Sequence, residues 1–155
     1  MKPLRIEMAR DAESERIEHS AAYARPARRI LIVEDNYFVA HQCETALREA
    51  GYDVVDIVET AEQALEVAMR RRPELVLMDI YLPGKRDGID AAIEIFQRLG
   101  IRSVFASALA DPGIKARAEG AQPLAWLVKP FNDRKLVVTV EAALREVTAF
   151  SEAQS

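Results

Sequence analysis

Short apolar runs recur along the chain from Arg29 onward, and each has the length and branching typical of a buried strand. The runs lie at 30–33, 54–58, 75–78, 103–106 and 125–128, and segments with apolar residues at helical spacing separate them. The pattern predicts five strands that alternate with five helices. Because nearly continuous apolar strands joined by helices form parallel sheets covered on both faces, we expect an α/β fold.

Capping residues mark where the predicted helices begin and end. Glycine is common just past a helix, and Ser, Thr or Asp is common just before one. The first helix is expected from about Phe38 to Gly51, with Cys43 on its buried side, and the third from about Ile89 to Gly100. The second follows Thr60, includes Met69 on its apolar stripe and stops before Pro73. A short fourth helix follows Asp111, and the last runs from about Asn132 to Val147.

Composition places the chain among ordinary single domains. It has 155 residues, enough for one domain with a little spare length, and half of them are hydrophobic, so a core without disulfides is expected. Its single cysteine rules out an intrachain disulfide framework and a cysteine-based zinc site. Apolar runs of about five residues are far shorter than the roughly 20 that span a bilayer. We therefore expect a cytoplasmic protein, and the pI near 5.3 argues against a general nucleic-acid binder.

Charge divides the chain unevenly. Residues 1–29 carry seven Lys or Arg and five Asp or Glu, which leaves 14 basic and 20 acidic residues in the remainder. The first segment also has few large apolar residues, so we predict a flexible N-terminal extension over 1–28, a domain over 29–148 and a C-terminal tail over 149–155. A helix that docks onto a partner is an alternative for the N-terminal segment.

Polar residues follow four of the predicted strands. Glu34 and Asp35 come after the first strand, Asp79 after the third, Ser107 after the fourth and Lys129 after the fifth. Ligands of such sheets bind outside the carboxyl ends of the strands. Any one of these residues alone would be a helix cap or a solvated side chain, whereas together they predict a site at this edge.

Electrostatics indicates what this edge binds. Two carboxylates about 4 Å apart repel by about 4 kcal/mol at an effective dielectric constant of 20, so ionised acids there require a cation. Oxygen ligands without His or Cys favour a hard ion, and a few protein oxygens with room for water favour Mg²⁺. A lysine and a hydroxyl beside Mg²⁺ suit a phosphoryl group. No Walker-type phosphate loop or dinucleotide fingerprint occurs.

These residues lie in motifs that resemble the receiver domains of bacterial two-component response regulators. The motifs are LIVEDN at 31–36, LVLMDIYLP at 75–83, FASA at 105–108 and WLVKPF at 126–131, and the resemblance extends from about Arg28 to Val147. It implies a doubly wound, flavodoxin-like fold with a five-stranded parallel sheet, strand order 2-1-3-4-5 and five helices.

The resemblance also implies a role for each acidic residue. Asp79 would be the phosphoacceptor, which takes a phosphoryl group from a phosphohistidine of a kinase. Asp35 would bind Mg²⁺ directly and Glu34 through water. Asp79 and the backbone carbonyl of Tyr81 would complete the protein ligands.

Four further residues receive roles from the same resemblance. Lys129 would pair with the phosphoryl oxygens, and Ser107 would donate a hydrogen bond to them. Trp126 stands where the family has the aromatic residue whose rotamer reports the state of Ser107. The bond between Lys129 and Pro130 is expected to be cis, which costs little only before proline.

The function expected from this resemblance is a stand-alone receiver whose change of state is read by a protein target. The expected partners are a sensor histidine kinase or a histidine phosphotransfer protein, with no direct nucleic acid and no membrane. A dimer through the fourth helix, fifth strand and fifth helix is compatible with the family. The alternative is a relay intermediate that passes the phosphoryl group to a histidine phosphotransfer protein. We do not expect a turnover enzyme, because aspartate-nucleophile phosphohydrolases need a second Asp where Tyr81 stands.

Overall fold

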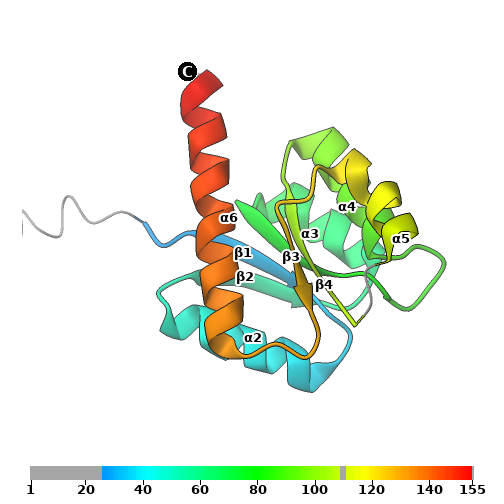
Figure 1. The fold of residues 1–155 in the computed structure, drawn as a ribbon, viewed down its shortest axis with the longest axis horizontal. Helices are drawn as coiled ribbons and strands as arrows, with labels where there is room; N and C mark the ends of the chain where they lie inside the picture. Colours follow the sequence, from blue (N-terminus) through cyan, green and yellow to red (C-terminus); the bar gives the residue numbers. More distant parts are fainter. Residues whose placement is uncertain (1–25, 109–110, 155) are drawn as a thin grey trace, which may run out of the picture.

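A parallel sheet of five strands forms the centre of the computed structural model, which describes residues 26–108 and 111–154 (Figure 1). The strand order is β2-β1-β3-β4-β5, which confirms the expected doubly wound topology. Most of the predicted N-terminal extension lies outside the described residues. The strands are β1 (Arg29–Val33), β2 (Asp53–Val58), β3 (Leu75–Asp79), β4 (Ser103–Ser107) and β5 (Ala125–Val128).

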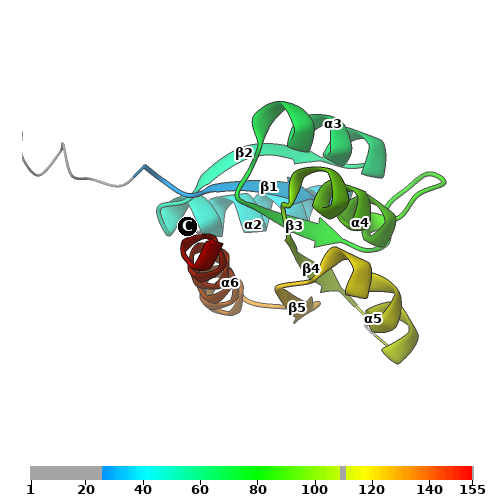
Figure 2. The same cartoon turned by 90° about the horizontal axis from the view of Figure 1, so that it is seen from above.

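Helices cover both faces of this sheet (Figure 2). On one face lie α2 (Tyr37–Glu49) and α6 (Asp133–Gln154), and on the other lie α3 (Ala61–Arg71), α4 (Gly88–Leu99) and α5 (Pro112–Ala118). A 3-10 turn, η1 (Glu119–Ala121), follows α5. Successive residues of β1 serve opposite faces: Ile30 and Ile32 contact the α2 and α6 side, whereas Leu31 and Val33 contact the α3 and α4 side. This alternation explains why the strands are apolar throughout.

The predicted helix caps are present. The Thr60 side chain accepts a hydrogen bond from the Gln63 backbone at 3.2 Å, and Asp111 accepts one from Ile114 at 2.9 Å. Gly51 and Gly100 have φ values of 94° and 70°, a left-handed conformation that glycine adopts without strain. The boundaries of α2, α3 and α4 therefore follow local signals in the sequence.

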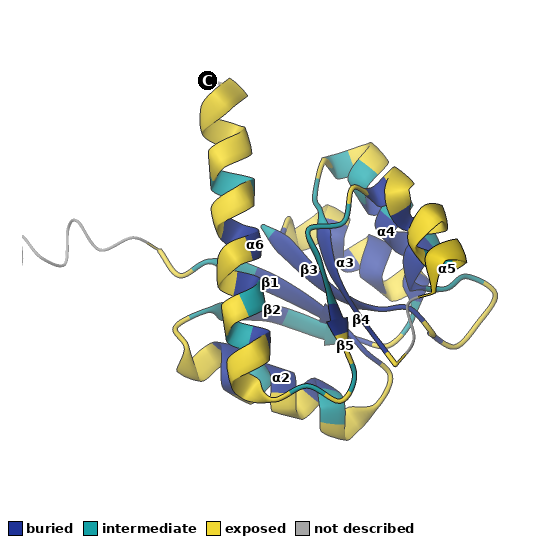
Figure 3. Cartoon of the chain, in the orientation of Figure 1, coloured by how far each residue is buried: buried dark blue, intermediate teal, exposed yellow. Residues whose placement is uncertain are grey.

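The predicted end of the last helix is wrong. Helix α6 continues to Gln154, so residues 149–154 are helical. No proline or glycine occurs between Asp133 and Gln154, and nothing in the local sequence stops the helix. Its last turns project beyond the sheet and are largely exposed (Figure 3).

Two residues assigned to buried helix stripes are exposed. Phe38 lies in the first turn of α2 with 81% of its surface accessible, and Met69 lies near the end of α3. Spacing alone could not reveal this, because a helix end that extends past its sheet exposes residues that continue the apolar stripe. Among the described helices, none is both long and apolar enough to cross a membrane.

Candidate metal centre

The parallel register brings the predicted polar residues to one edge of the sheet. Glu34 and Asp35 follow Val33, which is paired with Met78, so Asp79 lies directly beyond the same row. Asp79 is in turn paired with Ala106, the residue before Ser107. The Lys129 backbone N–H donates to the Ser107 carbonyl at 2.9 Å and continues this edge to β5.

Three carboxylates converge at this edge. One oxygen from each of Glu34, Asp35 and Asp79 lies within 4.8 Å of the others. Glu34 and Asp79 are buried, while Asp35 is exposed. The Glu34 backbone N–H donates to the Val58 carbonyl at 2.9 Å, which holds this residue against the end of β2. The predicted acidic cluster is therefore formed by the fold itself.

Lys129 supplies the positive charge of this cluster. Its Nζ donates a hydrogen bond to Glu34 Oε1 and lies 3.5 Å from Asp79 Oδ1. Partial burial lowers the Lys129 pKa, but the hydrogen bond with Glu34 and the negative charge of Asp79 outweigh burial, so the pKa is raised overall. The pairing of Lys129 with Glu34 was not anticipated from the sequence, where the two residues are 95 positions apart.

Burial and like charge act together on Asp79. Burial first, and then the hydrogen bond with Glu34 and its negative charge, raise the pKa of Asp79 to about 7. Lys129 opposes this shift without cancelling it. Without a further cation, Asp79 is therefore partly protonated near neutral pH, since ionising it would place two buried carboxylates side by side.

The donor set fits a hard divalent ion. It consists of carboxylate oxygens alone, two of them buried and one exposed to solvent, which leaves room for bound water. Tyr81 lies two residues past Asp79 and exposes its side chain, and its contribution through the backbone carbonyl stays a prediction. Glu34, Asp35, Asp79 and Tyr81 are the residues that would hold Mg²⁺ here.

Ser107 and Trp126, the two predicted switch residues, lie on adjacent strands. Ser107 is buried at the end of β4, one residue beyond the partner of Asp79. Trp126 is paired with Phe105 across β4 and β5, and the two rings stack with their centroids 4.9 Å apart. The Lys115 Nζ lies 5.6 Å from the centroid of the Trp126 ring. The bond between Lys129 and Pro130 is cis, as predicted.

One neighbour of Asp79 was missed in the sequence. Gly88 begins α4 and donates its N–H to the Ile80 carbonyl at 2.8 Å, and a Cβ at Gly88 would lie 1.8 Å from the Asp79 carbonyl oxygen. Only glycine permits this approach. The signal was present as Asp87-Gly88 with Asp90 three residues after the cap, but it also suits an ordinary loop.

Comparison with known families agrees with this geometry. A family model described as the response regulator receiver domain matches residues 30–141. The chain is 38% identical over 125 residues to the transcriptional regulatory protein PdtaR of Mycobacterium tuberculosis, a match that covers 79% of this chain and 60% of that protein. It is 33% identical over 122 residues to the DNA-binding response regulator MtrA of the same organism, covering 76% of this chain and 50% of MtrA. The chain thus spans 60% and 50% of the length of these two relatives.

Solved structures show the same fold. The N-terminal domain of a response regulator/sensory box/GGDEF 3-domain protein from Carboxydothermus hydrogenoformans has a TM-score of 0.73 and 33% identity, covering 80% of this chain and 99% of that one. A CheY-like response regulator receiver domain protein from Methanospirillum hungatei also has a TM-score of 0.73, at 25% identity, and covers 79% of this chain and 98% of that one.

Proposed function

From the premise that this chain belongs to the family of response regulator receiver domains of two-component signalling, we propose that Asp79 accepts a phosphoryl group from a phosphohistidine. The observation that carries the proposal is the position of the Asp79 carboxylate, which lies within 4.8 Å of oxygens of Glu34 and Asp35 and 3.5 Å from Lys129 Nζ. Such a carboxylate has an acid cluster for a cation on one side and an ammonium group on the other.

The reaction is a transfer between two nucleophiles. An Asp79 carboxylate oxygen attacks the phosphorus, an O–P bond forms, and the N–P bond of the phosphohistidine breaks. The imidazole leaves with the bonding electron pair and is protonated by solvent. Before transfer, Asp79 must be ionised, and the positive charge of Lys129 favours that form.

Charge neutralisation is the main contribution of the surrounding residues. Mg²⁺, when bound by Glu34, Asp35, Asp79 and the Tyr81 carbonyl, supplies a Lewis acid for the phosphoryl oxygens. Lys129 exchanges its contact with Asp79 for one with a phosphoryl oxygen. Ser107, at the end of the adjacent strand, donates its hydroxyl to the same group.

An exposed apolar surface of this chain lies beside the site and suits docking of the protein that donates the phosphoryl group. Tyr37 and Phe38 are both exposed in the first turn of α2, which follows the acidic pair after the cap residue Asn36. A groove of about 330 Å³ adjoins them, lined by Val39, Gln42, Ala108, Lys129, Pro130 and Phe131. We propose that a sensor histidine kinase or histidine phosphotransfer protein docks here, because Lys129 belongs both to the groove and to the site.

The proposed output is a change in protein contacts and not substrate turnover. Tyr81 stands where an aspartate-nucleophile phosphohydrolase would need its second Asp, and its side chain has no carboxylate to protonate a leaving group. Trp126, between Phe105 and Lys115, would report the state of Ser107 to a downstream protein. The expected cytoplasmic location, the absence of direct nucleic-acid and membrane contacts, and a dimer through α5, β5 and α6 stay predictions.

Phosphorylation can be tested by intact mass. The chain is incubated with acetyl phosphate and Mg²⁺, and we expect the wild type and Asp53→Asn to gain one phosphoryl group while Asp79→Asn gains none. Asp53 is a matched control because it begins β2 at the opposite edge of the sheet. Chelation with EDTA should abolish uptake. Equal uptake by Asp79→Asn and wild type would contradict the proposal.

The relay alternative needs a different measurement. A relay intermediate loses its phosphoryl group to an added histidine phosphotransfer protein faster than to water, whereas a terminal receiver loses it only by hydrolysis. Following radiolabel from the phosphorylated chain to candidate phosphotransfer proteins distinguishes the two roles.

A further inference from the structure

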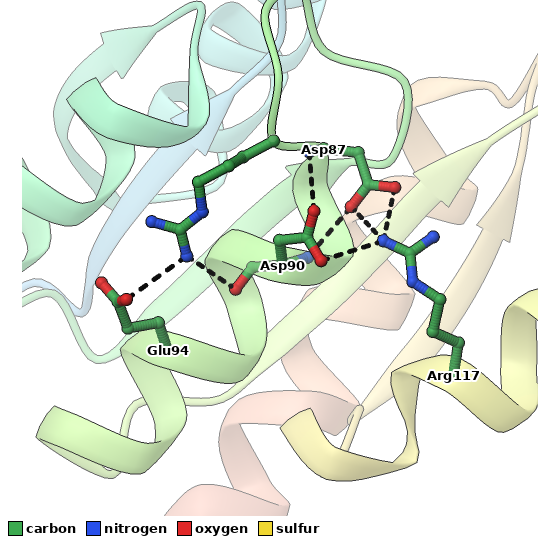
Figure 4. Close-up of polar contacts among 5 residues, drawn as sticks. Asp87, Asp90, Glu94 and Arg117 are labelled. Atoms are coloured by element: carbon green, nitrogen blue, oxygen red, sulfur yellow. Dashed lines mark hydrogen bonds and ion pairs between the residues drawn. The ribbon is translucent and has the colours of Figure 1, made fainter.

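A second charged cluster lies next to the site, at the start of α4. Arg117, on α5, contacts two aspartates there through one nitrogen (Figure 4). Its Nη2 lies 2.6 Å from both carboxylate oxygens of Asp87 and 3.1 Å from Asp90 Oδ1. We call Arg117, Asp87 and Asp90 the Arg117 clamp. It joins residues 27 and 30 positions apart in the chain.

The two aspartates of the clamp also form the cap of α4. The Asp87 side chain accepts a hydrogen bond from the Asp90 N–H at 3.0 Å, and the Asp87 N–H donates to the Asp90 side chain at 3.2 Å. This reciprocal pair fixes the first turn of the helix. Any displacement of Arg117 therefore pulls on the helix start itself and not on a freely moving side chain.

The same helix start rests on the backbone of the proposed phosphoacceptor. Gly88, between the two aspartates, donates its N–H to the Ile80 carbonyl at 2.8 Å. Its Cα approaches the Asp79 carbonyl so closely that no side chain fits there. The contacts thus run without a gap from Asp79 through Gly88 and Asp87 to Arg117.

At its other end the clamp holds a weakly anchored helix. Helix α5 has seven residues, lies beside α4 at the margin of the fold, and buries only Ala118 (Figure 2). Its remaining contacts include the partly buried Ile114 against the core and Lys115 over the Trp126 ring. With so little buried apolar surface, the position of α5 depends strongly on its polar contacts.

We propose that Arg117 is a positioning residue that couples the state of Asp79 to the position of α5. The inference rests on the proposed function, because it concerns how phosphorylation of Asp79 reaches this helix. A phosphoryl group at Asp79 shifts the backbone on which Gly88 rests, the α4 start moves with it, and the clamp carries that movement to α5 and the nearby Trp126. Without Arg117, the site and α5 lose this connection.

Arg86 provides a matched control. It precedes Asp87 in the same loop, and its Nη2 lies 3.5 Å from the Asp90 carbonyl and 3.4 Å from Glu94 Oε1. Both of these partners belong to α4, so Arg86 braces the helix start without reaching α5. Arg86→Gln removes an arginine from the same neighbourhood and leaves the clamp intact.

Hydrogen exchange read by mass spectrometry tests the coupling. Wild type, Arg117→Gln, Arg117→Lys and Arg86→Gln are compared with and without acetyl phosphate and Mg²⁺, and intact mass confirms phosphorylation of each. We expect the phosphorylation-dependent change in exchange over 112–118 to fall at least about threefold in Arg117→Gln. Arg86→Gln should behave as wild type, and Arg117→Lys should recover part of the change because a single nitrogen makes all the clamp contacts.

The experiment distinguishes failure of the Arg117 coupling from failure of the proposed phosphorylation of Asp79. A difference between two states of the same variant is measured, so a uniform loosening of α5 does not imitate the effect. If wild type is phosphorylated and the α5 response is the same in Arg117→Gln, or absent in wild type, the coupling is wrong while the proposed function stands. If wild type takes up no phosphoryl group, the proposed function fails and the coupling fails with it.

Discussion

In each of two clusters of this domain, two carboxylates contact one cation, but the pKa of the aspartate shifts in opposite directions. At the metal centre, Glu34 and Asp79 share Lys129, and the pKa of Asp79 is raised to about 7. In the Arg117 clamp, burial also raises the pKa of Asp87, but hydrogen bonds from Arg117 and from backbone N–H groups lower it overall.

Burial explains the difference. Glu34 and Asp79 lie at the end of the central strands, where removing charge from water is costly, and their single lysine cannot compensate both. The clamp lies at the surface, where water screens repulsion and backbone donors are available. The buried cluster therefore has negative charge that a further cation can neutralise. In the exposed cluster, Arg117 and backbone donors already compensate the carboxylates, so this cluster acts as a structural contact.

Removing the cation that contacts the buried carboxylates should have the largest effect. Lys129→Gln leaves Glu34 and Asp79 without a cation, and we expect the free energy of unfolding in EDTA to fall by about 3 kcal/mol. Urea unfolding near neutral pH measures it. Lys135→Gln, on the exposed side of α6, is the control and should change stability by less than about 0.5 kcal/mol. If Lys129→Gln lowered the free energy of unfolding no more than this control, the buried carboxylates would not need a cation.

Removing the buried negative charge should stabilise the fold. Because the pKa of Asp79 rises from 3.8 to about 7 on folding, the protonated form is favoured in the native state. The stability that protonated Asp79 contributes to the fold is complete below pH 3.8 and is lost as the pH rises through about 7. In EDTA at about pH 8, Asp79→Asn should therefore be more stable than wild type by about 2 kcal/mol.

The control for this prediction is the pH profile itself. The two proteins should converge in stability as the pH falls toward 4, and Mg²⁺ should stabilise wild type more than Asp79→Asn at high pH. Parallel unfolding curves across the whole range would contradict the assignment of the shift to Asp79.

The matching substitution in the exposed cluster should cost much less. With 46% of the Arg117 side chain accessible, Arg117→Gln should lower the free energy of unfolding by less than about 1 kcal/mol, and high salt should shrink the difference. Urea unfolding at low and high salt measures both effects, with Arg86→Gln as the comparison. A loss as large as that of Lys129→Gln would remove the distinction between the clusters.

The smallest effect is the acid dependence of the clamp. Since the pKa of Asp87 is lowered on folding, its stabilisation is present above its ordinary value of 3.8 and is lost as the pH falls through the lowered native value. The difference between wild type and Arg117→Gln, about 0.5 kcal/mol near neutrality, should therefore vanish in strong acid. The dependence of stability on pH that Asp87 contributes is therefore opposite in sign to that of Asp79. A difference that grows as the pH falls would contradict it.

Local patterns in the sequence were sufficient for much of the fold. Each predicted strand is present, and the caps at Thr60 and Asp111 form because they involve residues only three positions apart. Asp79 was found because it directly follows an apolar strand, and the parallel arrangement determines which strand ends meet. The same local reasoning misjudged the burial of Phe38, which depends on how far the sheet extends beneath the helix. It also ended α6 too early, although no proline or glycine stops that helix.

The sequence by itself determined the alternation of strands and helices and the residue types at the carboxyl edge, because these depend on neighbours a few positions away. Only the tertiary structure decided that Lys129 hydrogen-bonds to Glu34, that Gly88 touches the backbone of Asp79, and that Arg117 reaches Asp87. It also decided the sign of each pKa shift. The physical reason is that desolvation and charge contact depend on distances in space between residues far apart in the chain, and these distances exist only once the sheet and its helices have packed together.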